Sequence, residues 1–419
     1  MSARKFGLFL LARRSLRQHA LSTVVTSLSL AMACGLVMAV LAISAQSRAA
    51  FALESTPFDA VLGARGSQVQ LVLNSVFHLE TSPGNLPWAR YLEIAARPGV
   101  RAALPYAVGD SWRGFRIVGT DERMFDPRLL GPKTPRVAIG RVFDPTLREI
   151  VVGSFVAQRT GVRVGDEIHP SHGVGEHGAE HDEDYVVVGV LATTNTPLDR
   201  CLWIPIEGMF RMQGHVLRGD GAEFHAEPDQ AIPDENKEVS AVLLAFESPQ
   251  VGLELDRAIN KDGRDATLAW PIARVVAELF DKLGWMNRVL GLVAYLTMLV
   301  GAASILASLY DAMHQRRREF AILRALGARR GQLFATIVLE ATSIATLGAL
   351  GGVAVYLGIL ATAREIVRAQ TGVVLELSYF HPALLAVPLA SIALGAVCGV
   401  IPAWKAYRVE VAEHLAPAS

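Results

Sequence analysis

Cysteine is scarce in this chain of 419 residues, which contains only three. Cys34 and Cys398 lie inside long apolar runs, and Cys201 is alone in the polar segment between those runs, so no disulfide can form within that segment. The dipeptide Gly-Lys does not occur. A phosphate-binding loop of the form G-x-x-x-x-G-K-S/T is therefore excluded, and any ATPase that drives this protein is expected to be a separate chain.

Net charge is absent as well, because 40 basic and 40 acidic residues cancel. Charged residues are missing altogether from four long stretches, at 20–47, 289–310, 341–363 and 382–404. Each stretch reaches or exceeds the roughly 20 apolar residues that cross about 30 Å of hydrocarbon. Four such stretches exclude a soluble enzyme. They predict an α-helical membrane protein with four transmembrane helices, the third of which is expected to begin at residue 332.

The charges that remain are distributed unevenly. Residues 1–19, 311–331 and 405–419 together hold 13 Lys and Arg against 4 Asp and Glu, whereas residues 48–288 hold 25 against 33. Because Lys and Arg are retained on the cytoplasmic side, the basic segments and both termini are predicted to be cytoplasmic, and residues 48–288 and the short loop 364–381 to lie outside. A cleaved signal peptide is the alternative for the first stretch, but this stretch is about twice the length of a signal peptide's apolar region.

Residues 48–288 mix two periodicities. Runs rich in β-branched residues predict strands at 115–120, 148–153, 185–191 and 240–246. Helical spacing is found at 87–100 and 251–263, so we expect an α+β extracytoplasmic domain with its own core. Residues 267–288 are amphipathic, and we expect them to continue into the second transmembrane helix as a stalk.

Two cytoplasmic segments have amphipathic patterns. Residues 1–19 are interpreted as a helix that lies along the membrane surface, with a flexible basic tail as the alternative. In the loop 311–331, Phe320, Leu323 and Leu326 recur at helical spacing between clusters of arginine. Such a helix could dock into a groove of a soluble partner. The alternative is that the arginines only orient the chain in the membrane, but the apolar stripe would then have no purpose.

The same loop resembles a family. Its sequence RRREFAILRALGA, which spans 316–328, resembles the cytoplasmic coupling segment of the MacB/FtsX/LolC-type ABC transporter permeases. The large outer domain after the first of four spans is similar to that family too, as a MacB-like periplasmic core. The shorter sequences FDAVLGARGS, LVLNSVFHLE and TNTPLDR resemble permeases that pair with a LolD-like ATPase. The resemblance assigns coupling to the ATPase to Arg316, Glu319, Phe320, Leu323, Arg324, Leu326 and Gly327.

The resemblance also implies partners and a mechanism. Two permease copies would assemble with two cytoplasmic LolD-like ATPases in the cell inner membrane, and the ATPases, not this chain, would bind ATP and Mg²⁺. ATP-driven movement would be transmitted to the outer domain, and substrate would be exported or extracted at the periplasmic face, with a periplasmic protein or lipoprotein as a further partner. A non-transporting scaffold that activates a periplasmic enzyme is the alternative. The lipid bilayer is the other expected contact, and no nucleic-acid partner is expected.

Four histidines, His169, His172, His177 and His181, lie among acidic residues in the segment 169–184. Imidazole and carboxylate groups are suitable Zn²⁺ ligands, so this loop is a candidate metal site. The alternative is a solvated excursion between strands. The pattern H-x-x-E-H at 177–181 occurs in some zinc peptidases, but it needs a helix, and the glycines nearby indicate a loop.

Three further titratable residues stand out. Glu340 either lies within the membrane as a functional carboxylate or marks the membrane boundary, with the residues before it at the interface. His78 and His381 are isolated, and we interpret each as a packed or surface residue instead of a ligand.

Overall fold

The structure is a computed structural model that describes residues 13–50, 56–173, 183–212, 230–325, 327–371, 374–376 and 379–407. The chain forms two compact units. The helical unit comprises residues 1–47, 283–366 and 375–419, and the α/β unit comprises residues 48–282 and 367–374.

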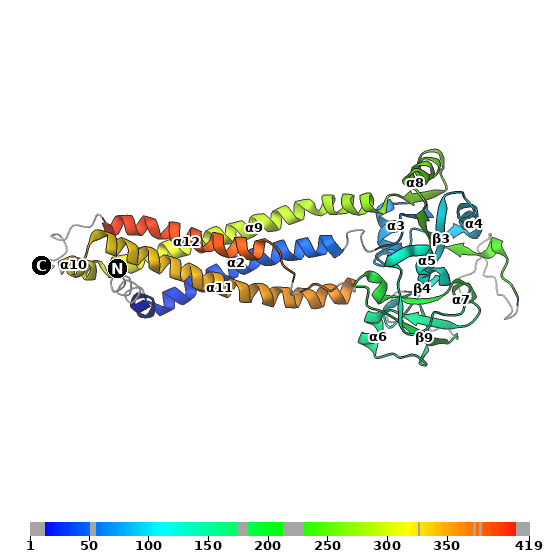
Figure 1. Ribbon diagram of the computed structural model, residues 1–419, viewed down its shortest axis with the longest axis horizontal. Helices are drawn as coiled ribbons and strands as arrows, with labels where there is room; N and C mark the ends of the chain where they lie inside the picture. Colours follow the sequence, from blue (N-terminus) through cyan, green and yellow to red (C-terminus); the bar gives the residue numbers. More distant parts are fainter. Residues whose placement is uncertain are drawn as a thin grey trace. The chain divides into compact units, whose positions relative to one another are not determined.

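Four long helices run side by side in the helical unit (Figure 1). They are α2 (Ala20–Ala50), α9 (Ile272–Gln315), α11 (Arg330–Thr371) and α12 (Ala383–Tyr407), and each contains a segment long and apolar enough to cross a membrane. The four membrane helices expected from the uncharged stretches are therefore confirmed. The short helix α10 (Arg317–Ala325) lies between α9 and α11 in the sequence.

The helices extend further than the uncharged stretches. Helix α11 continues to Thr371, so the outer loop expected at 364–381 begins with two more helical turns. The sequence from Arg364 to Gln370 contains no glycine or proline to end the helix earlier. Helix α9 begins only at Ile272, because residues 266–269, included in part in the expected stalk helix, form a strand instead.

Glycines allow three of the long helices to pack closely. A Cβ atom added at Gly348 of α11 would lie 2.8 Å from Leu30 of α2, and one at Gly352 would lie 2.8 Å from Cys34. A Cβ atom at Gly395 of α12 would lie 2.3 Å from Ala345 of α11. We call Gly348, Gly352 and Gly395 the glycine seam. The seam lets backbones approach to distances that larger residues forbid.

The α/β unit is built on a mixed sheet. Its strands are β1 (Ala60–Ala64), β3 (Val100–Trp112), β4 (Phe115–Thr120), β5 (Val137–Gly140), β6 (Glu149–Val152), β7 (Glu167–Ile168), β8 (Ser171–His172), β9 (Tyr185–Leu191), β10 (Leu202–Pro205), β12 (Ala241–Phe246) and β13 (Ala266–Ala269). The main order is β13-β1-β12-β3-β4-β10-β6-β9-β5, with β7 beside β9 and β8 beside β3. Strand β10 pairs parallel with β4, and β6 pairs parallel with β9. Strands β2 (Leu86–Pro87) and β11 (Glu238–Val239) form a separate pair.

Short helices accompany the sheet. They are α3 (Gln68–Ser75), α4 (Trp88–Ala95), α5 (Pro127–Leu130), α6 (Ser154–Thr160), α7 (Ile206–Arg211) and α8 (Pro249–Asp256). The 3₁₀ turns are η2 (Glu122–Phe125), η3 (Gly131–Lys133), η4 (Pro197–Arg200) and η5 (Asp234–Asn236), and the π-helix η6 (Arg257–Asp262) directly follows α8. The four expected strands are confirmed, within one residue, as β4, β6, β9 and β12. The helical stretch expected at 87–100 is confirmed only as far as the end of α4, because β3 begins at Val100, and the stretch expected at 251–263 corresponds to α8 followed by η6.

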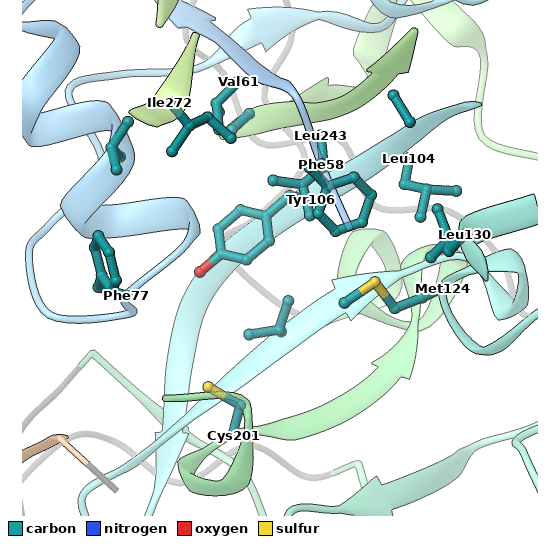
Figure 2. Close-up of a cluster of buried hydrophobic side chains, with 14 of the residues drawn as sticks. Phe58, Val61, Phe77, Leu104, Tyr106, Met124, Leu130, Cys201, Leu243 and Ile272 are labelled. Carbon is teal, nitrogen blue, oxygen red and sulfur yellow. The ribbon is translucent and has the colours of Figure 1, made fainter. Parts of the chain in front are cut away.

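The core of the unit lies on the sheet. Every residue of β12 and β4 is buried, as expected for central strands with continuous apolar runs. Figure 2 shows part of this core, where Tyr106 and Leu104 of β3 lie near Met124 and Leu243. Arg116 is the exception in β4, because it places a guanidinium inside a buried strand.

Candidate functional site

Helix α10 begins at a break after α9 and ends at a glycine. The N–H of Ala328 donates to the carbonyl of Leu323, and the N–H of Gly327 donates to the carbonyl of Arg324, each over 3.0 Å. This is the Schellman arrangement, which requires a left-handed residue after the helix. Gly327 has φ +97°, a conformation in which other residues are strained. The sequence LRALGA therefore fixes the end of α10.

Arg316, at the break between α9 and α10, connects three parts of the helical unit. Its Nη1 donates to the hydroxyl of Ser15 over 2.5 Å and lies 3.6 Å from Oε2 of Glu340 in α11. The Ser15 hydroxyl donates to Oε1 of Glu340 over 2.6 Å. On the other side, Arg316 Nε donates to Glu319 of α10 over 3.0 Å. We call Ser15, Arg316, Glu319 and Glu340 the arginine cluster.

The arginine cluster is buried at its centre. Ser15 is fully buried, Glu340 is 5% exposed and Arg316 is 9% exposed. A buried charge needs a partner, and removing one member of such a pair leaves the other uncompensated. The Glu340 carboxylate is therefore paired inside the protein, and its position within the membrane or at the membrane boundary stays a prediction.

Apolar contacts hold α10 from the same side. Phe320 is buried in a cluster with Met313, Leu333, Ile337 and Ala403, and Leu323 packs against this cluster. The Arg316 guanidinium lies 5.3 Å from the centre of the Phe320 ring. Helix α10 is thus fixed to α9, α11 and α12 by both apolar and charged contacts.

The exposed face of α10 is not the face of Phe320 and Leu323, which the sequence spacing suggested for docking. Glu319 and Ala325 are exposed, and Ile322 is an exposed large apolar residue at 45%. Leu323 and Arg324 are only partly exposed. Leu326 lies outside the described residues. The expected docking role of these residues stays a prediction, and Ile322 is the candidate that the sequence did not single out.

In the α/β unit, the sequence TNTPLDR forms a tight loop around Asp199. This buried carboxylate accepts hydrogen bonds from the backbone and hydroxyl of Thr194 and from the backbone N–H of Asn195, over 2.8 to 3.1 Å. Burial raises the pKa of Asp199, and these hydrogen bonds oppose that shift. The loop holds Asn195 at φ +55°, where its side chain pairs with the backbone of Val374.

The last turns of α11 also contact this region. Arg368 donates to Oε1 of Gln158 in α6, and its guanidinium lies 5.3 Å from the centre of the Phe155 ring. The guanidinium of Arg200 lies 5.8 Å from the same ring. Residues 367–374 are therefore part of the α/β unit, joined to it through Asn195 and α6.

A second network of hydrogen bonds surrounds Arg116. Its guanidinium donates to the carbonyl and side-chain oxygens of Asn74 and to the carbonyl of Glu80, over 2.8 to 3.2 Å. Tyr106 donates to the same Asn74 carbonyl over 3.0 Å and lies 2.8 Å from Nδ1 of His78. Burial, with Arg116 nearby, lowers the pKa of His78 to about 3. His78 is thus a packed, neutral residue, as the sequence suggested.

The histidine segment is described only at its two ends. His169 pairs with Asp184, and Nδ1 of His172 in β8 lies 3.2 Å from Oδ1 of the buried Asp110. His177 and His181 lie outside the described residues. Within the described ranges no group of three or more His, Cys, Asp or Glu residues is placed to hold a metal ion. The zinc site stays a prediction.

Comparisons with known proteins match most of the chain. The family described as MacB-like periplasmic core domain matches residues 23–241, and the family described as FtsX-like permease C-terminal matches residues 291–411. The first of these covers more than half of the chain, and the second covers α10 and the arginine cluster from Arg316 onward.

Individual relatives are more distant. Macrolide export ATP-binding/permease protein MacB of Hyphomonas neptunium is 29% identical over 34% of this chain and 21% of its own length. Pyoverdine export ATP-binding/permease protein PvdT of Pseudomonas aeruginosa is 27% identical over 42% of this chain and 26% of its own length. The uncharacterized ABC transporter permease YknZ of Bacillus subtilis is 24% identical over 52% of this chain and 57% of its own length. The matches thus span about a fifth to somewhat over half of these relatives, and on the two matched families this chain belongs to the MacB/FtsX-type ABC transporter permeases.

Proposed function

We propose that this chain is the membrane subunit of an ATP-driven machine in the cell inner membrane, and that a separate LolD-like ATPase docks on α10 from the cytoplasm. ATP-driven movement would pass from α10 to the α/β unit outside, which would export or extract its substrate at that face. A second copy of the chain would complete the assembly. The names of MacB and PvdT, which combine ATP-binding with permease, support the ATP requirement.

The arginine cluster is the observation that carries the proposal. A helix that only oriented the chain in the membrane would not need a buried ion pair to hold it. Here α10 is attached to α11 through Arg316 and Glu340, and Phe320 packs against Leu333 and Ile337 of the same helix. A displacement of α10 therefore acts on α11.

Helix α11 provides the path of transmission. It is one continuous helix of 42 residues, which carries Glu340 in its first part and Arg368 near its end. At about 1.5 Å per residue, the 28 positions between these two residues correspond to about 42 Å. A continuous helix transmits an axial displacement along this length without an intervening hinge.

The exposed side of α10 supplies the docking residues. An apolar residue gives affinity to such a contact, whereas charges determine its orientation. Ile322 and Glu319 are both exposed there, while Leu323 lies against the protein's own cluster. Leu323→Asp would therefore disturb the helical unit as well as the contact, and Ile322→Asp is the cleaner test.

The experiment is co-purification of the full chain with a LolD-like ATPase, followed by measurement of ATP turnover. Ile322→Asp should reduce both the ATPase recovered and its stimulation by about tenfold, because a buried unpaired charge at the contact opposes binding. Ile139→Asp is the matched control, since Ile139 is equally apolar and 62% exposed in the α/β unit. Full recovery and turnover with Ile322→Asp would place the docking site elsewhere.

A further inference from the structure

A recess in the α/β unit lies where several unusual segments meet. Its volume is about 180 Å³, many times the roughly 10–15 Å³ that one water needs. Its walls include Arg116 of β4, Arg200 of η4, His78, Cys201 and Gln370 near the end of α11. All of these residues belong to the α/β unit.

Arg200 is prepared to bind an anion. Its guanidinium lies over the rings of Phe115 and Phe155, at 5.7 and 5.8 Å from their centres, which restricts its position. Within the described part of the chain, no acidic side chain and no hydrogen-bond acceptor is in contact with this guanidinium. None of the guanidinium nitrogens of Arg200 is both fully buried and unpartnered, so its N–H groups reach accessible space. An arginine in this state presents donors to a ligand.

The other groups in the recess do not neutralise it. Arg116 is buried and bonds to Asn74 and Glu80 through uncharged oxygens, and among the described residues it has no ion-pair partner. Burial raises the pKa of the Cys201 thiol to about 12, so the thiol is neutral, and His78 is neutral as well. The recess therefore carries two positive charges without a negative one at neutral pH.

Strained backbone is concentrated around the same recess. Three non-glycine residues in the described ranges have positive φ, namely His78 at +55°, Arg113 at +49° and Asn195 at +55°. His78 lines the recess, Arg113 precedes the lining residue Gly114, and Asn195 lies two positions before the lining residue Pro197. Such conformations cost free energy and are found preferentially at ligand-binding sites.

Gln370 provides a polar group on the side of α11. Its side chain has no hydrogen-bond partner among the described residues. Along the helix it lies seven positions after Ala363, the last residue of the uncharged stretch, which corresponds to about 10 Å. The headgroup layer occupies about 5–8 Å on each side of the hydrocarbon. A helix that leaves the hydrocarbon at Ala363 would thus carry Gln370 just beyond this layer.

We propose that this recess binds a phosphate-bearing anion, with Arg200 and Arg116 supplying the positive charge and Gln370 a further donor. The phosphate could belong to a lipid headgroup or to a soluble molecule. Binding would connect η4 to the end of α11 and so stiffen the joint between α11 and the rest of the α/β unit. The site does not depend on the ATPase, so its failure would leave the proposed function untouched.

The test is calorimetry on the full chain in a non-ionic detergent that contains no phosphate. The two probes are inorganic phosphate and a water-soluble, short-chain phosphatidylglycerol. Wild-type protein should bind at least one of them, and Arg200→Gln should bind it about tenfold more weakly, because a charge-assisted hydrogen bond is lost. Arg163→Gln, which removes an exposed arginine outside the recess, should bind like wild type.

Gln370→Ala is the second variant, and it keeps the test informative if Arg200→Gln does not fold. It should weaken binding by about threefold, as expected for one neutral hydrogen bond. Tighter binding of phosphatidylglycerol than of phosphate would identify a lipid headgroup as the source, and the reverse order would identify a soluble anion. No binding of either probe by wild type, or equal binding by wild type, Arg200→Gln and Gln370→Ala, would overturn the proposal.

Discussion

Asn195 pairs with the backbone of Val374 through both ends of its side-chain amide. Its Nδ2 donates to the Val374 carbonyl over 3.4 Å, and its Oδ1 accepts from the Val374 N–H over 2.6 Å. The two residues are 179 positions apart. This reciprocal pair fastens the chain that leaves α11 to the loop around Asp199.

Two substitutions at Asn195 separate this pairing from backbone strain. Glycine accepts φ +55° without strain but cannot pair, whereas alanine loses the pair and is strained as well. We expect Asn195→Gly to lower the free energy of unfolding by about 1–2 kcal/mol and Asn195→Ala by about 1 kcal/mol more. Thermal unfolding of the purified full chain measures both. Equal stability of wild type and Asn195→Gly would show that the pair contributes nothing.

The ion pair of Glu340 and Arg316 should be costly to break from one side. Glu340→Gln leaves the buried Arg316 guanidinium without its buried carboxylate partner. We therefore expect a loss of about 3 kcal/mol in unfolding free energy. Combining Glu340→Gln with Arg316→Gln removes both charges and should be less harmful than the sum of the single changes. A double-mutant cycle by thermal unfolding gives the coupling energy. Simple additivity would mean that the two charges do not interact.

Stability should fall in mild acid because of His78. Its pKa is about 3 in the folded protein and about 6.5 in an unfolded chain, so between these values only the unfolded chain takes up the proton. Protonation of His78 in the unfolded chain therefore lowers the free energy of unfolding by up to about 1.4 kcal/mol per pH unit as the pH falls from 6.5 toward 3. Above about pH 7, His78 does not change the free energy of unfolding with pH. Asparagine tolerates positive φ and does not titrate, so His78→Asn should lose this part of the slope. Unfolding curves between pH 4 and 8 compare the two proteins, and parallel pH profiles would contradict the assignment.

The orientation in the membrane is tested by labelling single cysteines with an impermeant reagent. The background lacks Cys34, Cys201 and Cys398. We expect Glu122→Cys, exposed in the α/β unit, to be labelled in intact cells, and Gln315→Cys, exposed at the end of α9, to be labelled only after lysis. The opposite pattern would invert the topology.

Zinc binding by the histidine segment stays a prediction that the full chain can test. Changing His169, His172, His177 and His181 to serine together should remove a weak Zn²⁺ site, because imidazoles are the expected ligands. His172→Ser alone is an informative control, since His172 already contacts the buried Asp110. Calorimetry with Zn²⁺ should show weaker binding only for the fourfold variant if the other histidines hold the ion. Identical titrations of wild type and the fourfold variant would contradict the predicted Zn²⁺ site.

Local patterns predicted much of the fold. An uncharged stretch can be recognised without knowing its neighbours, and a run such as YVVVGVL specifies its strand through alternating burial in β9. The stalk was misplaced at its start because ATLA at 266–269 is apolar in a way that fits either a helix or a strand. Residues 266–269 form a strand because they pair with β1, which lies about 200 positions earlier in the sequence.

The candidate sites depend on distant contacts, which local patterns do not reveal. Ser15 meets Glu340 across 325 positions, and no spacing rule connects them. The outward face of α10 is set by where Arg316 interrupts the helix, so Leu323 turned inward and Ile322 outward. Arg116 looks like an exposed residue of an alternating strand, and only the complete sheet reveals that it is buried.

The glycine seam constrains how this sequence can vary. A methyl group at Gly352 would meet Cys34, and one at Gly395 would meet Ala345, at distances that real Cβ atoms do not adopt. A larger residue on one helix can be accommodated only if its opposite residue shrinks, and Ala345 can shrink only to glycine. Substitutions along the seam are therefore expected to occur in matched pairs among relatives, so that the facing positions of α2, α11 and α12 would be inherited together.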